Sequence, residues 1–441
     1  MKINQAALLA LPALSSAFPG MGGVASKAET EKFIRRQYEA ENLEKRQTLT
    51  TLTGTIAALA STVTGLLGSV ASSVDPSNLR PERDFTYQAP ASTDSRGPCP
   101  GLNLLANYNY LPRNGHVTFG QVINATSRGF NMGADLATVL LVFAILTDGD
   151  IATESFYLGS LNGVGGLNRH STVEADVSPN REDYYLGCGD NHHVSSRLFA
   201  QNVGYAYLSS SKQFDLGTMG NQYAASASFS KKYNPYLYYF PFPQIVSLGA
   251  FAFYPNFFSN GTYGAGGVAN YESISSIIGA KFIKSTGQFQ YVPEQWPAYW
   301  YRRATPYGAV QALTDALVSI YPKNIIVPLA SQAGTPNLSA RDLLCDIYQG
   351  INSITPLGLA GALGATAEGV TWALSKLTPV IGAGTTLGCP LSTLSPNENT
   401  FFTNASSTGG PGKNPASSTA HTGNNVYNKV YFPVAPVVPT C

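Results

Sequence analysis

The chain has little charge for its length. Only 12% of its 441 residues are charged, and 27 Lys and Arg residues nearly balance 26 Asp and Glu residues, for a net charge of +1. Nucleic acids and anionic membranes both attract basic faces, so neither is expected as a partner. The longest apolar run, residues 136–146, is too short to cross a bilayer and predicts a buried helix rather than stable membrane insertion.

Cysteine is also scarce, and the five cysteines cannot all pair with one another. One of them, Cys99, lies between Pro98 and Pro100. Pro100 suits the first position of a helix, which makes Cys99 the N-cap in front of the unpaired amides of residues 101–103. These amides are expected to lower the pKa of the thiol toward thiolate, which can ligate a metal such as haem iron. The alternative is an ordinary disulfide.

The residues around Cys99 carry a family resemblance. Residues 98–103 (Pro-Cys-Pro-Gly-Leu-Asn), 105–107 (Leu-Ala-Asn) and 110–115 (Tyr-Leu-Pro-Arg-Asn-Gly) together resemble the opening motif of the fungal haem-thiolate peroxidases, the chloroperoxidase and unspecific-peroxygenase group. The resemblance implies a mainly α, chloroperoxidase-like helical haem domain with long loops and little β structure. It also implies haem b, with Cys99 as the axial iron ligand, and H₂O₂ with a small organic substrate as reactants.

A second cluster of ligand atoms occurs at residues 174–178 (Glu-Ala-Asp-Val-Ser). Glu174, the carbonyl of Ala175 and Ser178 offer hard oxygen ligands within five residues, which suits Mg²⁺ or Mn²⁺. The cluster resembles the family's Glu-X-Asp-X-Ser motif, which implies that the metal lies near a haem propionate and that Asp176 supports the turn. The alternative is a solvated acidic loop.

The chain departs from the family where a proton-transferring acid is expected. Cleavage of the O–O bond of peroxide needs a group that takes a proton and returns it, and in the better-known members this is a glutamate. The corresponding stretch here, residues 246–253, contains no ionisable side chain. Glu294 is a candidate catalytic residue, with a structural salt bridge as the alternative, and Glu272 is no better placed. Water is a third possibility.

Two further features have competing interpretations. The adjacent His192 and His193 suggest zinc, but no third ligand occurs at a suitable spacing, so they are interpreted as structural. Residues 233–263 are rich in Phe, Tyr and Pro, and they predict either an apolar substrate channel or ordinary core packing.

The ends of the chain are interpreted as processing and tail segments. Residues 1–17 have the positive start, apolar stretch and small residues of a secretory signal peptide, although a short buried helix is the alternative. Residues 18–46, which end in a Lys-Arg pair, predict a pro-peptide, and 47–84 predict an amphipathic helix and linker. The haem-thiolate peroxidase domain is then 85–390, followed by a tail at 391–441. The product is expected to be secreted and extracellular.

If Cys99 ligates haem, four cysteines remain for an oxidising compartment. Cys345 with Cys389 is the preferred disulfide because both lie in the C-terminal helical region. Cys188 with Cys441 follows by elimination only, and an intermolecular bond from Cys441 competes, so the protein is a monomer or a disulfide-linked dimer. Four sequons permit N-glycosylation: Asn124, Asn260, Asn337 and Asn404.

Together these features predict a secreted haem-thiolate peroxidase or peroxygenase, an oxidoreductase that uses H₂O₂ to oxidise or oxygenate organic substrates or a halide. One alternative is a haem-thiolate oxidase dedicated to one pathway of secondary metabolism, which the missing acid favours. Another is a secreted haem-binding glycoprotein without turnover.

Overall fold

The computed structural model describes residues 77–160, 166–170, 172–234, 237, 242–324, 344–348, 350–351, 367–381 and 388–389. The predicted signal peptide, pro-peptide and C-terminal tail lie outside these residues, as does most of the 47–84 segment, including the whole of its predicted amphipathic helix. The sequons at Asn337 and Asn404 and the cysteine at Cys441 also lie outside them.

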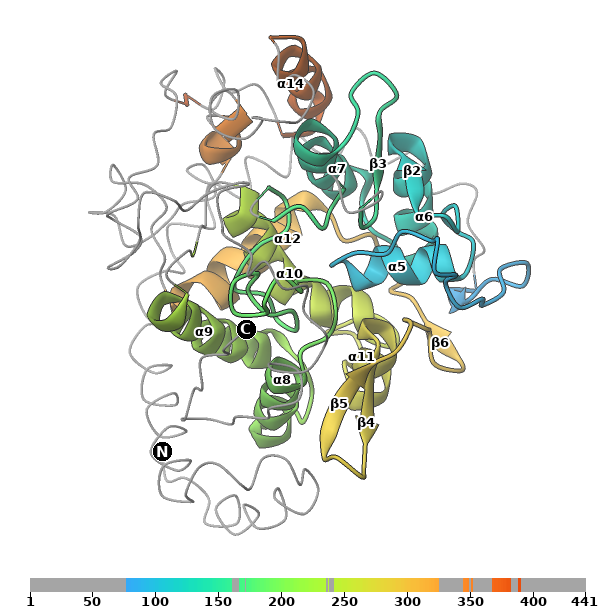
Figure 1. Cartoon of the computed structure of the whole chain (residues 1–441), viewed down its shortest axis with the longest axis vertical. Coiled ribbons are helices and arrows are strands. Elements are labelled where there is room, and N and C mark those ends of the chain that lie inside the picture. Colours follow the sequence, from blue (N-terminus) through green and yellow to red (C-terminus); the bar gives the residue numbers. More distant parts are fainter. Residues whose placement is uncertain are drawn as a thin grey trace.

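The described part of the chain is mainly helical, with short strands and long connections, as predicted (Figure 1). The α-helices are α5 (Pro100–Asn107), α6 (Phe119–Phe130), α7 (Ala134–Asp148), α8 (Ser196–Leu208), α9 (Leu216–Tyr233), α10 (Phe242–Phe258), α11 (Tyr271–Ile278), α12 (Ala309–Asp315) and α14 (Ala367–Ile381). A π-helical turn at Ala316–Ile320 and a 3₁₀ turn at Tyr321–Lys323 continue α12.

The strands form three separate antiparallel pairs and no larger sheet within the described residues. These pairs are β1 (Leu79–Arg80) with β6 (Trp300–Tyr301), β2 (His116–Thr118) with β3 (Ser155–Tyr157), and β4 (Ala280–Ile283) with β5 (Gln288–Tyr291). The first two pairs join segments that are distant in sequence, whereas β4 and β5 form a hairpin.

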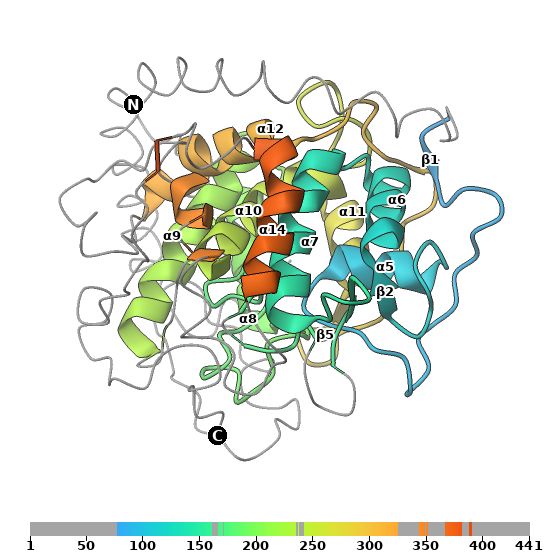
Figure 2. The same ribbon diagram turned by 90° about the horizontal axis from the view of Figure 1, so that it is seen from above.

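The core is built on two apolar helices, α7 and α10. All but two of the 15 residues of α7 are buried, which confirms the buried helix predicted from its continuous apolar sequence. One side of α7 packs against α6 and another against α14 (Figure 2). Helix α10 packs against α9, α11 and α12. A helix that is apolar on all sides must be covered on all sides. Packing against neighbouring helices covers part of α7 and α10, and their remaining faces border a cavity.

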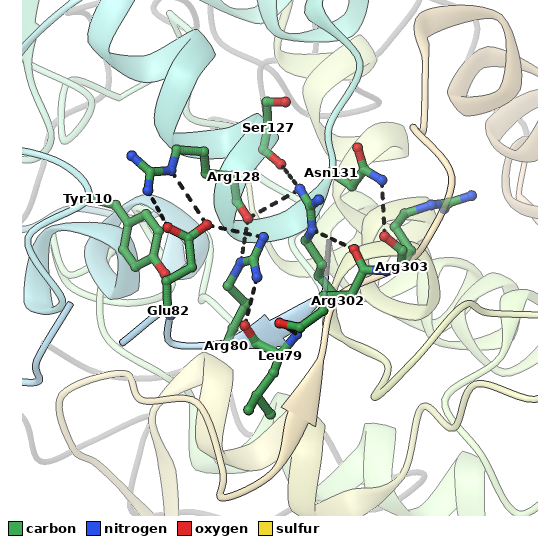
Figure 3. A network of polar contacts seen from close by, with 11 residues as sticks. Leu79, Arg80, Glu82, Tyr110, Ser127, Arg128, Asn131, Arg302 and Arg303 are labelled. Atoms are coloured by element: carbon green, nitrogen blue, oxygen red, sulfur yellow. Dashed lines mark hydrogen bonds and ion pairs between the residues drawn. The ribbon is translucent and has the colours of Figure 1, made fainter. Parts of the chain in front are cut away.

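A network of arginines fixes the C-terminal end of α6 (Figure 3). The guanidinium of Arg80 donates to the carbonyl of Arg128 at 2.6 Å, and that of Arg302 donates to the carbonyl of Ser127. Glu82 forms ion pairs with Arg80 and Arg128. Positive groups at a helix C-terminus interact favourably with its unpaired carbonyls. Strands β1 and β6 are thereby tied to the helix that carries Phe130 into the cavity wall.

Candidate active site

Cys99 occupies the position predicted for it, directly before α5. Its backbone is extended, with φ −86° and ψ 105°, and Pro100 is the first helical residue. The thiol is free. Burial raises the pKa of Cys99, and the backbone N–H groups of Gly101 and Leu102 lower it by less. The prediction of a lowered pKa is therefore wrong for the thiol in this cavity, because desolvation outweighs the helix N-terminus.

Asn103 holds the loop that presents Cys99. Its side-chain oxygen accepts from the N–H of Gly97 at 2.9 Å, and its amide donates to the carbonyl of Gly97 at 2.8 Å. A Cβ on Gly97 would lie 1.8 Å from the carbonyl oxygen of Leu158, so only glycine permits this close approach. The side chain of Asn103 and the close packing of Gly97 against Leu158 thus fix the Pro-Cys-Pro segment.

Cys99 lines a large, mostly apolar cavity. The cavity has a volume of about 230 Å³, whereas one water needs roughly 10–15 Å³. Its walls come from α5, α6, α7 and α10, and six apolar contributors are Leu105, Val122, Phe130, Leu141, Val246 and Phe253. Such a space suits a bulky, largely apolar ligand.

The acidic motif lines the same cavity as Cys99. Glu174, Ala175 and Ser178 all face it, although 75 residues or more of sequence separate them from the cysteine. Glu174 is buried, and its Oε1 has no hydrogen-bond partner among the described residues. This burial argues against a solvated acidic loop. The structure therefore brings the two predicted ligand sets together around one space.

His170 orients Glu174 and was missed by the sequence reasoning. Its Nδ1 lies 2.8 Å from Glu174 Oε2, and both side chains are buried. Burial favours the neutral ring, but the charges of Asp176 and Glu174 outweigh this and raise the pKa of His170 to about 9. The imidazolium can thus hold one carboxylate oxygen and leave the other toward the cavity. Their i, i+4 spacing is the signal that could have identified the pair.

Two buried aspartates hold the turn of the acidic motif. Asp176 accepts from the N–H of Tyr184 at 3.1 Å and from the amide of Asn234 at 2.9 Å. Asp183 accepts from the N–H of Val177, whose positive φ of 61° needs such support. Burial raises the pKa of both carboxyls. Asp176 therefore supports the turn in the way the resemblance implied.

The polar atoms left unpaired in the cavity wall fit a haem. The guanidinium nitrogens of Arg181 make no hydrogen bond to any described residue although the side chain is 2% exposed, and their ion pair with Glu294 is long, at 3.7 Å. The amide nitrogen of Asn180 is buried near the Tyr254 hydroxyl and has no other partner among the described residues. Unpaired buried donors are costly and require an acceptor, which the propionates of a haem supply. A thiol, apolar walls and anion-seeking donors together match the cofactor.

Comparison with known proteins agrees with this geometry. The profile of the family described as "Peroxidase, family 2" matches residues 85–305, half of the chain. The chain belongs to this peroxidase family. Family membership implies a haem cofactor.

Several curated relatives of the chain are peroxidases or peroxygenases. An aromatic peroxygenase of Coprinellus radians is 40% identical over 136 residues, which are 28% of this chain and 51% of the relative. An aromatic peroxygenase of Cyclocybe aegerita is 36% identical over 179 residues, 38% of this chain and 48% of the relative. The dothistromin biosynthesis peroxidase dotB of Dothistroma septosporum is 28% identical over 335 residues, 72% of each chain. The matched segments thus span about half the length of the two peroxygenases.

The wall where this peroxidase family is expected to carry its acid is apolar here. Val246, Ser247, Ala250 and Phe253 of α10 line the cavity, and none is ionisable. The Ser247 hydroxyl donates to the carbonyl of Val177 at 2.8 Å and is committed there. The aromatic-rich segment serves both predicted purposes, because some of its rings line the cavity while others, such as Phe251, pack in the core.

Glu294 lies outside the cavity lining. Its carboxylate accepts from the amide of Asn103 at 2.9 Å and from the hydroxyl of Tyr291 at 3.0 Å, and it is 0% exposed. Burial raises its pKa, and the charge of Arg181 lowers it by less. These contacts fit the structural alternative rather than a catalytic acid. Glu272 is exposed in the first turn of α11, also away from the cavity.

The two adjacent histidines do have a third potential ligand. Asp190 lies 2.8 Å from Nδ1 of His193 and 3.3 Å from Nδ1 of His192, and the ligand atoms of the three residues lie within 4.8 Å of one another. The expectation that no third ligand is available is therefore wrong, because the local turn brings Asp190 back over both rings. The Asp190 carboxylate also accepts hydrogen bonds from the backbone N–H groups of His192 and His193. Such bonds are typical of a turn, so a structural role explains the arrangement without a metal.

The remaining predicted sites are the disulfides and the glycosylation sequons. A disulfide joins Cys345 and Cys389, the preferred pair. The pairing of Cys188 with Cys441 stays a prediction.

Of the sequons within the described residues, Asn124 is exposed on α6, whereas the side-chain oxygen of Asn260 accepts from the N–H of Tyr301 at 2.8 Å. In the described part of the chain, no helix combines the length and apolarity needed to span a membrane.

Proposed function

We propose that this protein is a haem-thiolate peroxidase or peroxygenase, with Cys99 as the axial ligand of haem iron. Glu174, the carbonyl of Ala175 and Ser178 bind Mg²⁺ or Mn²⁺ beside a propionate. The observation that carries the proposal is that Cys99, the acidic motif and the guanidinium of Arg181, which makes no hydrogen bond to a described residue, face one apolar cavity. Bound haem supplies the oxidising chemistry, which the thiolate favours by donating electron density to the iron.

The protein's own residues position the reactants. Asn103 fixes the loop that carries the sulfur, and His170 holds one oxygen of Glu174 away from the cavity. Arg181 and Asn180 pair with carboxylates of the ligand. The apolar walls exclude water and favour an apolar organic substrate. Relatives named aromatic peroxygenase support an aromatic substrate class.

The second candidate function is a peroxidase dedicated to one biosynthetic pathway. The lack of a carboxylate on the cavity-facing side of α10 favours this candidate. Without such a group, proton transfer to peroxide is slow, which suits an enzyme dedicated to one specific substrate better than one that oxidises many. Two relatives that match over long segments, the aromatic peroxidase fscJ and the dothistromin biosynthesis peroxidase dotB, also support it. This candidate predicts low turnover of generic substrates.

Secretion belongs to the proposal as well. It is supported by the signal-like sequence at residues 1–17 and by the disulfide between Cys345 and Cys389, since disulfides persist in oxidising compartments. Glycosylation at the exposed Asn124, and a monomer or disulfide-linked dimer, are expected consequences.

Peroxide-dependent oxidation of a small phenol by the purified haem-loaded protein tests this function. The wild type should turn over in proportion to H₂O₂, and Cys99→Ala should lose this activity. A wild type that binds haem but oxidises no more phenol than free haem would show a haem-binding protein instead. Bound Mg²⁺ or Mn²⁺ should be lost in Glu174→Gln and kept in Glu272→Gln, a matched change at an exposed carboxylate.

A further inference from the structure

A chain of oxidisable rings leads to the surface from just behind the cavity wall. Phe130 lines the cavity, and its ring centroid lies 5.9 Å from that of Trp296. Trp296 lies 4.7 Å from Tyr108, and Tyr108 lies 5.5 Å from Tyr87. Trp296 is 5% exposed, whereas Tyr87 is partly exposed. We call Trp296, Tyr108 and Tyr87 the aromatic chain.

The aromatic chain begins directly behind the cavity. Tyr108 is the C-cap of α5, the same helix whose N-cap is Cys99. Leu105 of α5 lines the cavity, and a Cβ on Gly129 would meet Leu105 at 2.4 Å and the ring of Trp296 at 3.5 Å. One layer of side chains therefore separates Trp296 from the cavity. The rate of electron transfer falls steeply with distance, so rings whose centroids lie 4.7 Å and 5.5 Å apart are suitable stepping points.

Packing alone does not explain tryptophan at position 296. Its indole N–H is buried without a hydrogen-bond acceptor among the described residues, and phenylalanine would avoid the cost of this unpaired donor. An oxidised indole with no acceptor nearby keeps its proton, so the oxidation stays reversible and the electron vacancy can pass to a neighbouring ring. Tyr87 lies at the surface beside Gln295 and can release its phenolic proton to water.

We propose that the aromatic chain carries electrons from the surface to the oxidised cofactor. Phenols that are too large to enter the cavity can then lose one electron at Tyr87. The inference rests on the proposed function for its oxidant, H₂O₂. Each phenol gives up one electron and one proton and becomes a phenoxyl radical. Two phenols and one H₂O₂ thus yield two phenoxyl radicals and two waters. The electrons pass through Tyr87, Tyr108 and Trp296.

Radical trapping in the full-length haem-loaded protein tests the route without relying on activity. The protein is mixed with H₂O₂ and a nitroso spin trap in the absence of substrate, and adducts are located by mass spectrometry. An adduct is expected on Tyr87 in the wild type and lost in Trp296→Phe, which keeps a ring but removes the oxidisable indole. Tyr299→Phe is the control, because Tyr299 is 80% exposed and lies outside the aromatic chain. It should leave the Tyr87 adduct unchanged.

Two substrates of different size give the kinetic test. Tyr87→Phe and Trp296→Phe should lose oxidation of a phenol-grafted dextran and keep oxidation of the free phenol. A Tyr87 adduct at wild-type level in Trp296→Phe overturns the route, as does equal loss on both substrates. A wild type that fails to oxidise the free phenol with H₂O₂ refutes the proposed function itself, so the two failures are distinguishable. Thermal melts of the variants check that each one is folded.

Discussion

Replacement of Glu294 by glutamine separates a structural carboxylate from a catalytic one. Glu294 is fully buried behind α5, where it accepts from Asn103 and Tyr291 and faces Arg181. Glutamine has nearly the same shape and keeps one acceptor oxygen, but it carries no charge. We therefore expect Glu294→Gln to lower stability and to leave the reaction with peroxide almost unchanged.

The size of the stability loss follows from the contacts of the carboxylate. A hydrogen bond to a charged group contributes about 1.5–3 kcal/mol and one between neutral groups about 0.5–1.5 kcal/mol. Weakening two such bonds and losing the 3.7 Å ion pair with Arg181 gives about 2–4 kcal/mol in total. Burial raises the pKa of Glu294, so the folded wild type binds a proton more readily than the unfolded chain and gains stability as the pH falls through this raised pKa. Glutamine does not titrate, so the difference in stability should widen over this range.

Denaturant unfolding and rapid mixing with H₂O₂ measure the two effects on the same haem-loaded samples. Glu272→Gln is the matched control, because this exposed carboxylate should change stability by less than about 0.5 kcal/mol. A fall of about 100-fold or more in the peroxide rate constant of Glu294→Gln, at unchanged haem content, would refute the structural role and identify a catalytic acid.

Three further changes follow from the structure. Ala250→Glu places a carboxyl on the cavity-facing side of α10 and should raise the peroxide rate constant by about 10²–10⁴-fold in rapid mixing, while Ala250→Gln should not. Replacing both Cys345 and Cys389 by alanine should cost about 4 kcal/mol in denaturant unfolding, because their bridge closes a loop with a sequence separation of 44; an unchanged midpoint argues against this estimate. Burial lowers the pKa of His192 to about 4, so the wild type should lose stability as the pH falls from about 6.5 toward 4. His192→Gln should flatten this part of the melting-temperature profile, and an unaltered slope would contradict the assignment.

Local chemistry made several features predictable from the sequence. Proline at position 100 fixes the start of α5, and with it the N-cap position of Cys99, without help from the rest of the fold. The continuous apolar sequence of α7 leaves burial as its only stable arrangement. The disulfide between Cys345 and Cys389, the pairing preferred from the sequence, is also present in the structure.

Features that depend on contacts between distant segments were not predictable. Glu294 meets Asn103 across 191 residues, so its distance from the cavity wall emerges only once the chain is folded. The raised pKa of Cys99 has the same origin, because desolvation comes from the surrounding helices and not from the helix that Cys99 caps. Asp190 joined the histidines through a turn geometry that residue spacing alone did not indicate.

The absorption spectrum of the reduced, CO-bound haem protein tests thiolate ligation by Cys99 most directly. Ligation by this sulfur predicts a strongly red-shifted Soret band in the wild type and its loss in Cys99→His, where an imidazole takes the place of the thiolate. A wild type without the red shift, or a Cys99→His variant that keeps it, would contradict the assignment of Cys99 as the iron ligand.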